Sequence, residues 1–390
     1  MPAHSKRLDL IPPYLFSEIA RVKAEMRAKG EDIIDLGIGD PDQPTPDSIV
    51  KAMQEAVTNA ATHRYDESAR GNIEFLEAGS RWYQKNFGVT IDPSKEMLEL
   101  IGSKEGLAHL VWAYADPGDA VIVPDPAYPV YRLHASMAGA DVHGTPLKQE
   151  NSFLPILSDI PTDIARRAKL FFTCYPNNPT GAVATSEFYE DVTRFCKEYD
   201  ILHVSDLAYA MVTYDGYRSP SPLQTAGSKD CTIEFHSLSK PFNMTGWRIG
   251  FACGSEKAIS SLSKLKDNID SKQFSAIAKS AAFALEYADN TPTMQLYKTR
   301  RDALVSGLRS AGWETNPPEA TFYIWARVPT DESSAEFAKR LLQEAKVLVI
   351  PGTGYGPNGE GYVRMSLTVS GDKNGERLAE AANRIAKLGI

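Results

Sequence analysis

Several features that would indicate other classes of protein are scarce or missing in this sequence. It has four cysteines in 390 residues and no C-x-x-C pair, which argues against both a zinc site of that type and a disulfide framework. Its seven histidines are scattered, without a spacing typical of metal ligands. We therefore expect no metal and a reducing compartment.

Basic runs and long apolar runs are also missing. The formal net charge is -8 and lysines and arginines do not cluster, so a nucleic-acid partner, which needs concentrated positive charge, is not expected. No stretch approaches the roughly 18 consecutive apolar residues that span a bilayer, and the N-terminus, MPAHSKRLDLIPPYLF, lacks the apolar core of a signal peptide. We expect a cytoplasmic protein without a membrane partner, in which any anionic substrate meets individually placed arginines.

Short apolar runs alternate with amphipathic stretches between residues 97 and 290. The run MLELIG at 97–102 predicts a strand, and SKEGLAHLVWAYA after it spaces its apolar residues on one helical face, with Ser103 as the N-cap. The same alternation continues to RIGFACG at 248–254. Near-continuous apolar strands separated by helices are typical of a parallel sheet covered on both faces, so we predict an α/β fold.

The length of the chain suits two domains. A long helical region at about 255–311 is followed by further strands, TFYIWARV, VLVI and YVRMSL, with helices between them. We predict a large domain over residues 46–290 and a smaller α/β domain built from residues 1–45 and 291–390. Ligands of parallel sheets lie beyond the carboxyl ends of the strands, and five conspicuous residues follow predicted strands: Ser103, Tyr128, Asn178, Asp206 and Lys240.

The stretch HSLSKPFNMTGWRIG at 236–250 contains one lysine, Lys240, whose spacing allows two chemistries. One is a serine nucleophile, Ser237, with Lys240 as its base in an S-x-x-K pair; the other is a lysine amine that forms a Schiff base with a carbonyl cofactor. The serine–lysine pair needs a serine that opens a helix and a later K-T-G strand. Here Ser237 closes an apolar run, proline follows the lysine and the sequence has no K-T-G, which favours the Schiff base.

Asp206 ends the apolar run ILHVSD. A buried carboxylate is costly unless it meets a positive charge. A protonated pyridine nitrogen is such a partner, and pyridoxal phosphate, an electron sink held by a lysine, unites Asp206 and Lys240 in one chemistry. The alternative is that Asp206 is the N-cap of a following helix, because aspartate is a favoured cap.

Other side chains supply the remaining groups that this cofactor needs. Asn178 in YPNNPTG and Tyr209 in SDLAYA can donate to the ring oxygen, although YPNNPTG can also be a plain rigid loop between a strand and a helix. Tyr128 in PDPAYPVY offers an aromatic face to the ring, and ordinary packing is the alternative. The phosphate needs donors, which are predicted at the turn GSKEG and around Lys240. They are Ser103, Lys104, Ser237 and Arg248.

Arg364 lies within the apolar run YVRMSL. An arginine there is costly unless paired, and a substrate α-carboxylate would satisfy it, with a structural salt bridge as the alternative. Gly39 in DLGIGDPDQPTP has no side chain, so backbone can approach the same carboxylate. The glycine-rich stretch at 351–362 runs from strand to strand without a helix to receive a pyrophosphate, which predicts a turn-rich loop and not a dinucleotide site.

In sequence order these motifs resemble the class I/II aminotransferases, pyridoxal phosphate enzymes of fold type I. The resemblance covers nearly the whole chain, through DLGIGDPD, RYDESARG, GSKEG, NNPTG, DLAY, SLSKPFNMTGWRIG and YVRMSL. It implies a mostly parallel, seven-stranded sheet between helices in the large domain.

The resemblance also implies a role for each candidate residue. Lys240 is the Schiff-base lysine, Asp206 pairs with the pyridine nitrogen, and Tyr209 joins them in catalysis while binding the ring oxygen with Asn178. Tyr128 stacks on the ring. The implied phosphate positions are Ser103, Lys104, Ser237 and Arg248, and the implied substrate-carboxylate positions are Gly39, Asn178 and Arg364.

Tyr65 in RYDESARG resembles the tyrosine that reaches the phosphate of the neighbouring subunit. This implies a homodimer with shared active sites, whose substrates are small amino acids and 2-oxo acids. A pyridoxal-dependent transcription regulator, which is conceivable by fold, would need an added DNA-binding domain and a basic surface.

Within the family, PPYLFSEI, GSKEG and HSLSKPFNMTGWRIGFACG are most similar to bacterial LL-diaminopimelate aminotransferases. The implied reaction is LL-2,6-diaminopimelate plus 2-oxoglutarate to tetrahydrodipicolinate and glutamate, in lysine and cell-wall precursor synthesis. Tyr14 then lies against the substrate, and Glu67 is the candidate for the distal amine, where plant-type members carry an acidic residue that YDESARG matches only approximately. Aspartate, alanine and aromatic aminotransferases and C–S β-lyases remain alternatives on the same scaffold.

Overall fold

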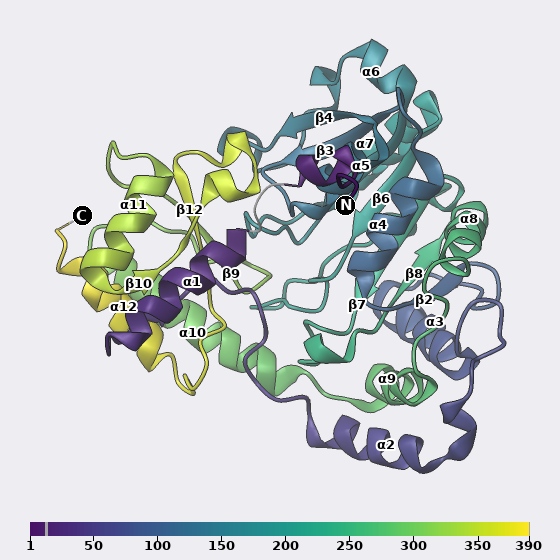
Figure 1. The fold of residues 1–390 in the computed structure, drawn as a ribbon, viewed down its shortest axis with the longest axis horizontal. Helices are drawn as coiled ribbons and strands as arrows, with labels where there is room; N and C mark the ends of the chain where they lie inside the picture. Colours follow the sequence, from purple (N-terminus) through teal and green to yellow (C-terminus); the bar gives the residue numbers. More distant parts are fainter. Residues whose placement is uncertain (12–14, 390) are drawn as a thin grey trace.

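The computed structural model describes residues 1–11 and 15–389 and centres on a seven-stranded sheet (Figure 1). The strand order is β2-β8-β7-β6-β5-β3-β4, and β8 alone runs against its neighbours. The predicted α/β fold with a mostly parallel sheet is therefore confirmed. The strands are β2 (Met97–Leu100), β3 (Ala120–Asp125), β4 (Asp141–Pro146), β5 (Ala168–Cys174), β6 (Leu202–Asp206), β7 (Thr232–Ser237) and β8 (Gly250–Gly254).

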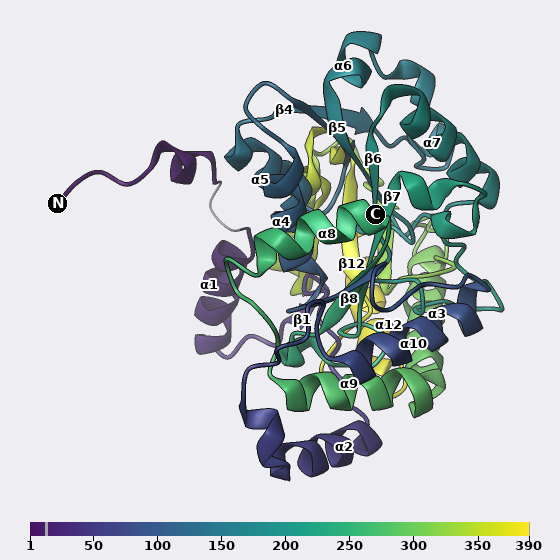
Figure 2. The ribbon, with the colours of Figure 1, turned by 90° about the vertical axis from the view of Figure 1, so that its right-hand side faces the viewer.

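Helices cover both faces of this sheet, which explains why its inner strands are apolar along their whole length. One face packs on α4, α5 and α8, and the other on α3, α6, α7 and α9. These layers are visible around the strands in Figures 1 and 2. The helices are α3 (Ile73–Phe87), α4 (Ser103–Tyr114), α5 (Val130–Ala138), α6 (Thr162–Arg167), α7 (Ser186–Tyr199), α8 (Glu256–Lys266) and α9 (Ser275–Tyr287). A further helix, α2 (Asp47–Thr58), packs on the outside of α9.

One prediction made for a strand end is wrong in detail, and an alternative considered for another is excluded. Ser103 is the first residue of α4 and not its N-cap; the cap is Gly102, which has φ +79° and makes no side-chain capping bond. Asp206 caps no helix, because residues 208–211 form turns after β6. The side chains of Ser103 and Asp206 are therefore not used up in helix capping.

A second group of elements packs beside the large sheet. The strands β11 (Ile350–Pro351), β12 (Tyr362–Ser366) and β9 (Tyr323–Arg327) form an antiparallel sheet, and β1 (Ile34–Asp35) pairs in parallel with β10 (Val347–Leu348). Around them lie α1 (Leu15–Ala28), α10 (Thr291–Ser310), α11 (Ser334–Arg340) and α12 (Glu376–Ala386). The segment at 351–362 runs from β11 to β12 through short helical turns, as predicted for a loop without a dinucleotide site.

The N-terminal residues lie apart from these layers. Residues 1–11 are all exposed, reach past α5 and extend away from the body in Figure 2. Across the described ranges, none of the helices combines the length and the apolar composition that a bilayer crossing requires.

Candidate active site

A cavity of about 450 Å³ opens where the carboxyl ends of the parallel strands face the smaller sheet. Eleven of the fourteen residues singled out from the sequence line it. They are Gly39, Ser103, Lys104, Tyr128, Asn178, Asp206, Tyr209, Ser237, Lys240, Arg248 and Arg364. The sequence motifs thus converge on one site, as expected for residues that follow neighbouring parallel strands.

Lys240 lies in the turn after β7, with its amine inside the cavity. Its Nζ donates to the carbonyl oxygen of Gly39 at 3.0 Å. The Ser237 hydroxyl, the other member of the S-x-x-K pair, accepts from the backbone N–H of Ser239. Burial lowers the pKa of the Lys240 ammonium to about 8, with the charges of Asp40 and Asp206 opposing the change. A lysine of this kind is partly neutral near pH 7 to 8, which is the form that attacks a carbonyl.

The carboxylate of Asp206 is held at the floor of the cavity. Its Oδ2 accepts from the Tyr131 hydroxyl at 2.7 Å and its Oδ1 from the backbone N–H of Ala208 at 3.2 Å. Burial raises the pKa of Asp206, although both hydrogen bonds and the charges of His236 and Lys240 oppose this rise. A cation bound in the cavity beside Asp206 would offset the cost of burying its charge.

Tyr131 was not anticipated from the sequence. It is fully buried in the first turn of α5, stacks on Phe172 at 4.9 Å and meets the ring of Tyr128 edge-on at 5.9 Å. Tyr128 lies before α5 begins, so helical spacing gave no signal that pointed to Tyr131.

The turn between β2 and α4 is shaped to hold an anion. Gly102 has φ +79°, and a Cβ there would lie 2.5 Å from Arg248 Nη2, so the guanidinium rests directly against the turn. A Cβ on Gly250 would lie 3.3 Å from the backbone nitrogen of Ser103. The N–H groups that open α4 and the Arg248 guanidinium therefore come together as donors for a phosphate.

Arg364 is almost fully buried on β12 and faces the cavity. Its Nη1 donates to Asn178 Oδ1 at 2.9 Å and its Nη2 to the Gly37 carbonyl at 2.7 Å, while the guanidinium lies 4.1 Å from the ring of Tyr323 and 4.9 Å from that of Tyr355. Among the described residues no carboxylate pairs with Arg364, and its Nε has no hydrogen-bond partner. The structural salt bridge considered from the sequence is therefore not formed, and a donor remains for a bound carboxylate.

The bond from Arg364 also orients Asn178. Because Asn178 Oδ1 accepts from the guanidinium, the amide NH₂ group is left to donate elsewhere in the cavity. This is the orientation that the predicted bond to a ring oxygen requires.

Two predicted residues do not join the site in a single chain. Tyr65 is 93% exposed and Glu67 is exposed, and neither lines the cavity. Tyr14 lies outside the described residues.

Comparison with known proteins identifies the family. The model of the aminotransferase class I and II family matches residues 31–385. The chain belongs to this family. The aminotransferase is 49% identical over 389 residues to LL-diaminopimelate aminotransferase 2 of a Nostoc species, with 99% of this chain and 98% of the relative covered. It is 47% identical to LL-diaminopimelate aminotransferase of Moorella thermoacetica, with 98% of each chain covered.

Solved structures of the same fold type are similar over the whole chain. Substrate-bound BacF from Bacillus subtilis superposes with a TM-score of 0.94 at 36% identity and covers 100% of this chain and 98% of its own. A Thermus thermophilus aspartate aminotransferase mutant gives 0.90 at 30% identity and covers 100% of both chains.

The aminotransferase depends on pyridoxal 5′-phosphate, as its family does. The residues of the cavity fit this cofactor: a buried carboxylate suits a protonated ring nitrogen, a lysine amine with a pKa of about 8 suits its aldehyde, and the α4 turn suits its phosphate.

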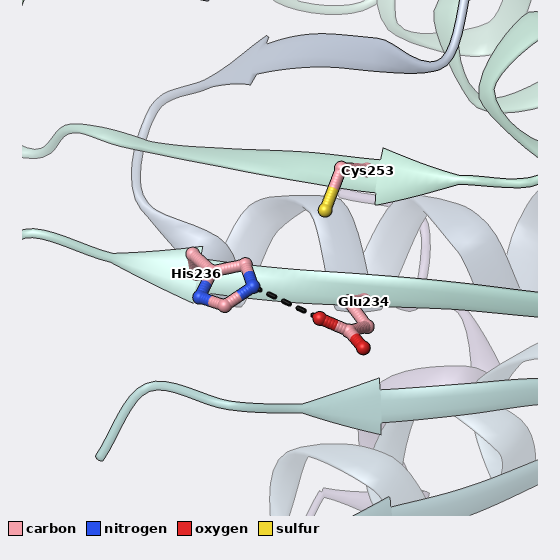
Figure 3. Close-up of side chains that lie close together, drawn as sticks. All are labelled: Glu234, His236 and Cys253. Atoms are coloured by element: carbon pink, nitrogen blue, oxygen red, sulfur yellow. Dashed lines mark hydrogen bonds and ion pairs between the residues drawn. The ribbon is translucent and has the colours of Figure 1, made fainter. Parts of the chain in front are cut away.

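A buried cluster lies on β7, the strand that precedes Lys240, and on its neighbour β8 (Figure 3). Glu234 and His236 on β7 and Cys253 on β8 place their polar atoms within 4.8 Å of one another, and Glu234 accepts from His236 Nε2 at 3.0 Å. Glu234 also accepts from the hydroxyls of Tyr83, at 2.8 Å, and Ser221. The Glu234 carboxylate therefore has hydrogen-bond donors, and these bonds stabilise β7, the strand that precedes Lys240.

Proposed function

We propose that this aminotransferase moves the amino group of LL-2,6-diaminopimelate to 2-oxoglutarate, giving tetrahydrodipicolinate and glutamate, in lysine and cell-wall precursor synthesis. The observation that carries the proposal is the identity of 47% to 50% to LL-diaminopimelate aminotransferases of several bacteria, over 98% to 99% of this chain. The Arg364 guanidinium, which has an unpaired Nε and no carboxylate partner among the described residues, supports binding of an α-carboxylate.

We assign the reacting roles to the residues at the centre of the cavity. When bound, pyridoxal 5′-phosphate supplies an electron sink for the electrons of the Cα–H bond. Lys240 would hold the cofactor through its amine until the substrate amine takes its place, and the freed amine then takes the Cα proton as general base and later returns a proton. Asp206 keeps the ring nitrogen protonated, and Tyr209 donates to the ring oxygen.

The remaining residues orient the cofactor and the substrate. Tyr128 stacks on the cofactor ring, and Asn178 donates to the ring oxygen while it braces Arg364. Arg364 binds the α-carboxylate, which approaches the backbone at Gly39. The phosphate is held by Ser103, Lys104, Ser237 and Arg248.

We propose that two chains share their active sites in a homodimer. Tyr65, which is 93% exposed in the single chain, reaches the phosphate in the partner's cavity. Glu67, near Tyr65 in the same exposed segment, is the candidate for the distal amine, and Tyr14 is a further candidate for substrate contact. We further propose that the enzyme is cytoplasmic.

We also propose the domain division made from the sequence. The large domain spans residues 46–290, and residues 1–45 join residues 291–390 in the small domain. The parallel pairing of β1 with β10 supports this assignment, because it ties the N-terminal segment to the C-terminal part of the chain.

Transfer from aspartate is the second candidate function, because the Thermus thermophilus aspartate aminotransferase structure superposes over the whole chain. The test is to mix the purified, cofactor-loaded enzyme separately with LL-diaminopimelate, aspartate, alanine, phenylalanine and glutamate while recording the visible spectrum. We expect rapid conversion of the cofactor to its amine form with LL-diaminopimelate and glutamate alone. Conversion by aspartate, alanine or phenylalanine instead would discard diaminopimelate, and release of pyruvate without a 2-oxo acid acceptor would indicate a lyase.

A further inference from the structure

Tyr323 lies at the point where four parts of the site meet, although no sequence motif singled it out. It begins β9, is 2% exposed and lines the cavity. Its hydroxyl is 2.9 Å from the hydroxyl of Tyr209 and 3.5 Å from the carbonyl oxygen of Gly39. Its ring covers the Arg364 guanidinium at 4.1 Å.

Either hydroxyl can donate in the 2.9 Å contact between Tyr209 and Tyr323. Each phenol has one proton to donate. The Gly39 carbonyl already accepts from Lys240 Nζ at 3.0 Å, and its contact with Tyr323 is at the outer limit for a hydrogen bond. When Tyr323 donates to Tyr209, the nearer of its two possible acceptors, the Tyr209 proton is left for an acceptor in the cavity.

Both phenols keep their protons at neutral pH. Burial raises the pKa of Tyr209 and that of Tyr323, and the charge of Arg364 opposes the rise in both. The chain of donors from Tyr323 to Tyr209 is thus intact over the range in which enzymes of this kind are assayed.

The ring of Tyr323 has a separate effect on Arg364. The guanidinium is flanked by Tyr323 at 4.1 Å and Tyr355 at 4.9 Å, and aromatic faces attract and orient a planar cation. Hydrogen bonds to Asn178 and Gly37 hold Nη1 and Nη2 of Arg364. The stacked Tyr323 ring adds a contact with the face of the guanidinium, which helps to fix its plane.

We propose that Tyr323 is a positioning residue for amino-group transfer: its hydroxyl directs the Tyr209 proton to the ring oxygen of the cofactor, and its ring holds Arg364 for the substrate carboxylate. The inference rests on the proposed function, since it needs Tyr209 and Arg364 in the roles given there. The two effects belong to different atoms of one side chain, so substitutions can separate them.

The test compares Tyr323→Phe, which removes the hydroxyl and keeps the ring, with Tyr323→Leu, which removes both. The visible absorption of the cofactor-loaded enzyme is titrated with pH, and KM and kcat are measured with LL-diaminopimelate and with aspartate. A donor to the ring oxygen stabilises its anionic form, so its loss raises the midpoint of the spectroscopic titration. In Tyr323→Phe the Tyr209 hydroxyl still donates to the ring oxygen but lacks the donor that polarises it, so we expect the midpoint to rise by about 0.2 to 0.4 pH unit, a fraction of the value of one hydrogen bond.

Two further expectations distinguish the hydroxyl from the ring. A variant with both Tyr209→Phe and Tyr323→Phe has the same midpoint as Tyr209→Phe alone, because the Tyr323 hydroxyl acts through Tyr209. Tyr323→Phe changes KM by less than about twofold, whereas Tyr323→Leu raises it about tenfold through loss of the stacked ring. Tyr214→Phe is the matched control, since Tyr214 is also buried and donates to the Thr321 carbonyl outside the cavity.

An unchanged midpoint in Tyr323→Phe, or shifts that add in the double variant, would overturn the role of the hydroxyl. Equal KM values for Tyr323→Phe and Tyr323→Leu would overturn the role of the ring. Lys240→Ala is measured in parallel: if it loses turnover while the Tyr323 variants behave as wild type, only this inference fails. If Lys240→Ala keeps turnover, the proposed function itself is wrong.

Discussion

The hydroxyl of Tyr131 donates a hydrogen bond of 2.7 Å to the carboxylate of Asp206, 75 positions away in the chain. Both side chains are buried, and the bond is one of two that stabilise the ionised form of a carboxylate whose pKa burial raises. Tyr131 therefore favours the charge that Asp206 needs in order to hold a protonated ring nitrogen.

Removal of this bond is expected to weaken cofactor binding. In Tyr131→Phe the Asp206 carboxylate keeps only the bond from Ala208, so we expect the dissociation constant of pyridoxal 5′-phosphate to rise about tenfold. Equilibrium titration of the apoenzyme with the cofactor measures it. Tyr189→Phe is the control, because Tyr189 is buried but its hydroxyl has no partner among the described residues. Equal affinities for Tyr131→Phe and wild type would show that Asp206 does not need this donor.

The lowered pKa of Lys240 predicts the pH dependence of cofactor loading. Only the neutral amine attacks an aldehyde, and the pKa of Lys240 is about 8. The rate at which apoenzyme combines with pyridoxal 5′-phosphate should rise with pH up to about 8 and then level off. Stopped-flow absorbance between pH 6.5 and 9.5 tests this, with Lys240→Ala as the variant that forms no covalent link. A rate that keeps rising beyond pH 9 would contradict burial as the controlling effect.

Glu99 on β2 predicts a component of stability that depends on pH. It is 1% exposed and accepts from the backbone N–H groups of Asn72 at 2.6 Å and Gln273 at 3.3 Å. Burial raises its pKa from 4.5 to about 7, Asp66 adds to the rise, and Lys266 opposes it. Between these two values the folded protein binds more protons than the unfolded one, so this contribution to stability is present below pH 4.5 and is lost as the pH rises to about 7.

The size of this effect can be measured by substitution. The change in pKa from 4.5 to about 7 corresponds to about 3 kcal/mol of unfolding free energy. We expect wild type to lose roughly that amount relative to Glu99→Gln between pH 5 and 8, as measured by urea unfolding at each pH. The exposed Glu55→Gln should instead follow wild type at every pH. Parallel pH profiles for Glu99→Gln and wild type would place the pKa of Glu99 near its usual value.

The proposed sharing of active sites predicts complementation between two inactive variants. If Tyr65 serves the partner's cavity, a mixed dimer of Lys240→Ala and Tyr65→Ala chains has one site with both residues intact and one with neither. We expect the mixture, after exchange of subunits, to recover up to about one quarter of wild-type activity, because about half of the dimers are mixed and each has one working site. Activity that does not exceed the sum of the separate variants would mean that Tyr65 acts in its own chain or not at all.

Much of the fold and most of the site followed from local sequence. The apolar strands and the intervening amphipathic helices predicted the α/β sheet, because burial on both faces requires that pattern. Residues such as Asp206 and Lys240 were identifiable because Asp206 ends its strand and Lys240 comes three residues after another, and parallel strands bring their carboxyl ends to one edge.

Details that depend on the exact backbone were less accessible. The N-cap of α4 is Gly102 and not Ser103, and the backbone there has φ +79°, a conformation that favours glycine. Asp206 was open to a capping role until the turns after β6 showed that no helix follows it directly.

The sequence by itself determined the chemistry of the protein: an aminotransferase with a lysine, an aspartate and an arginine in ordered motifs, since the functional groups of these side chains limit the reactions open to them. The tertiary structure alone decided that Tyr131 holds Asp206 and that Tyr323 joins Tyr209 to Arg364. These contacts link residues from 41 to 114 positions apart. One joins α5 to β6, one joins the paired strands β9 and β12, and one joins the end of the large sheet to the small sheet, and no local pattern of residues encodes them.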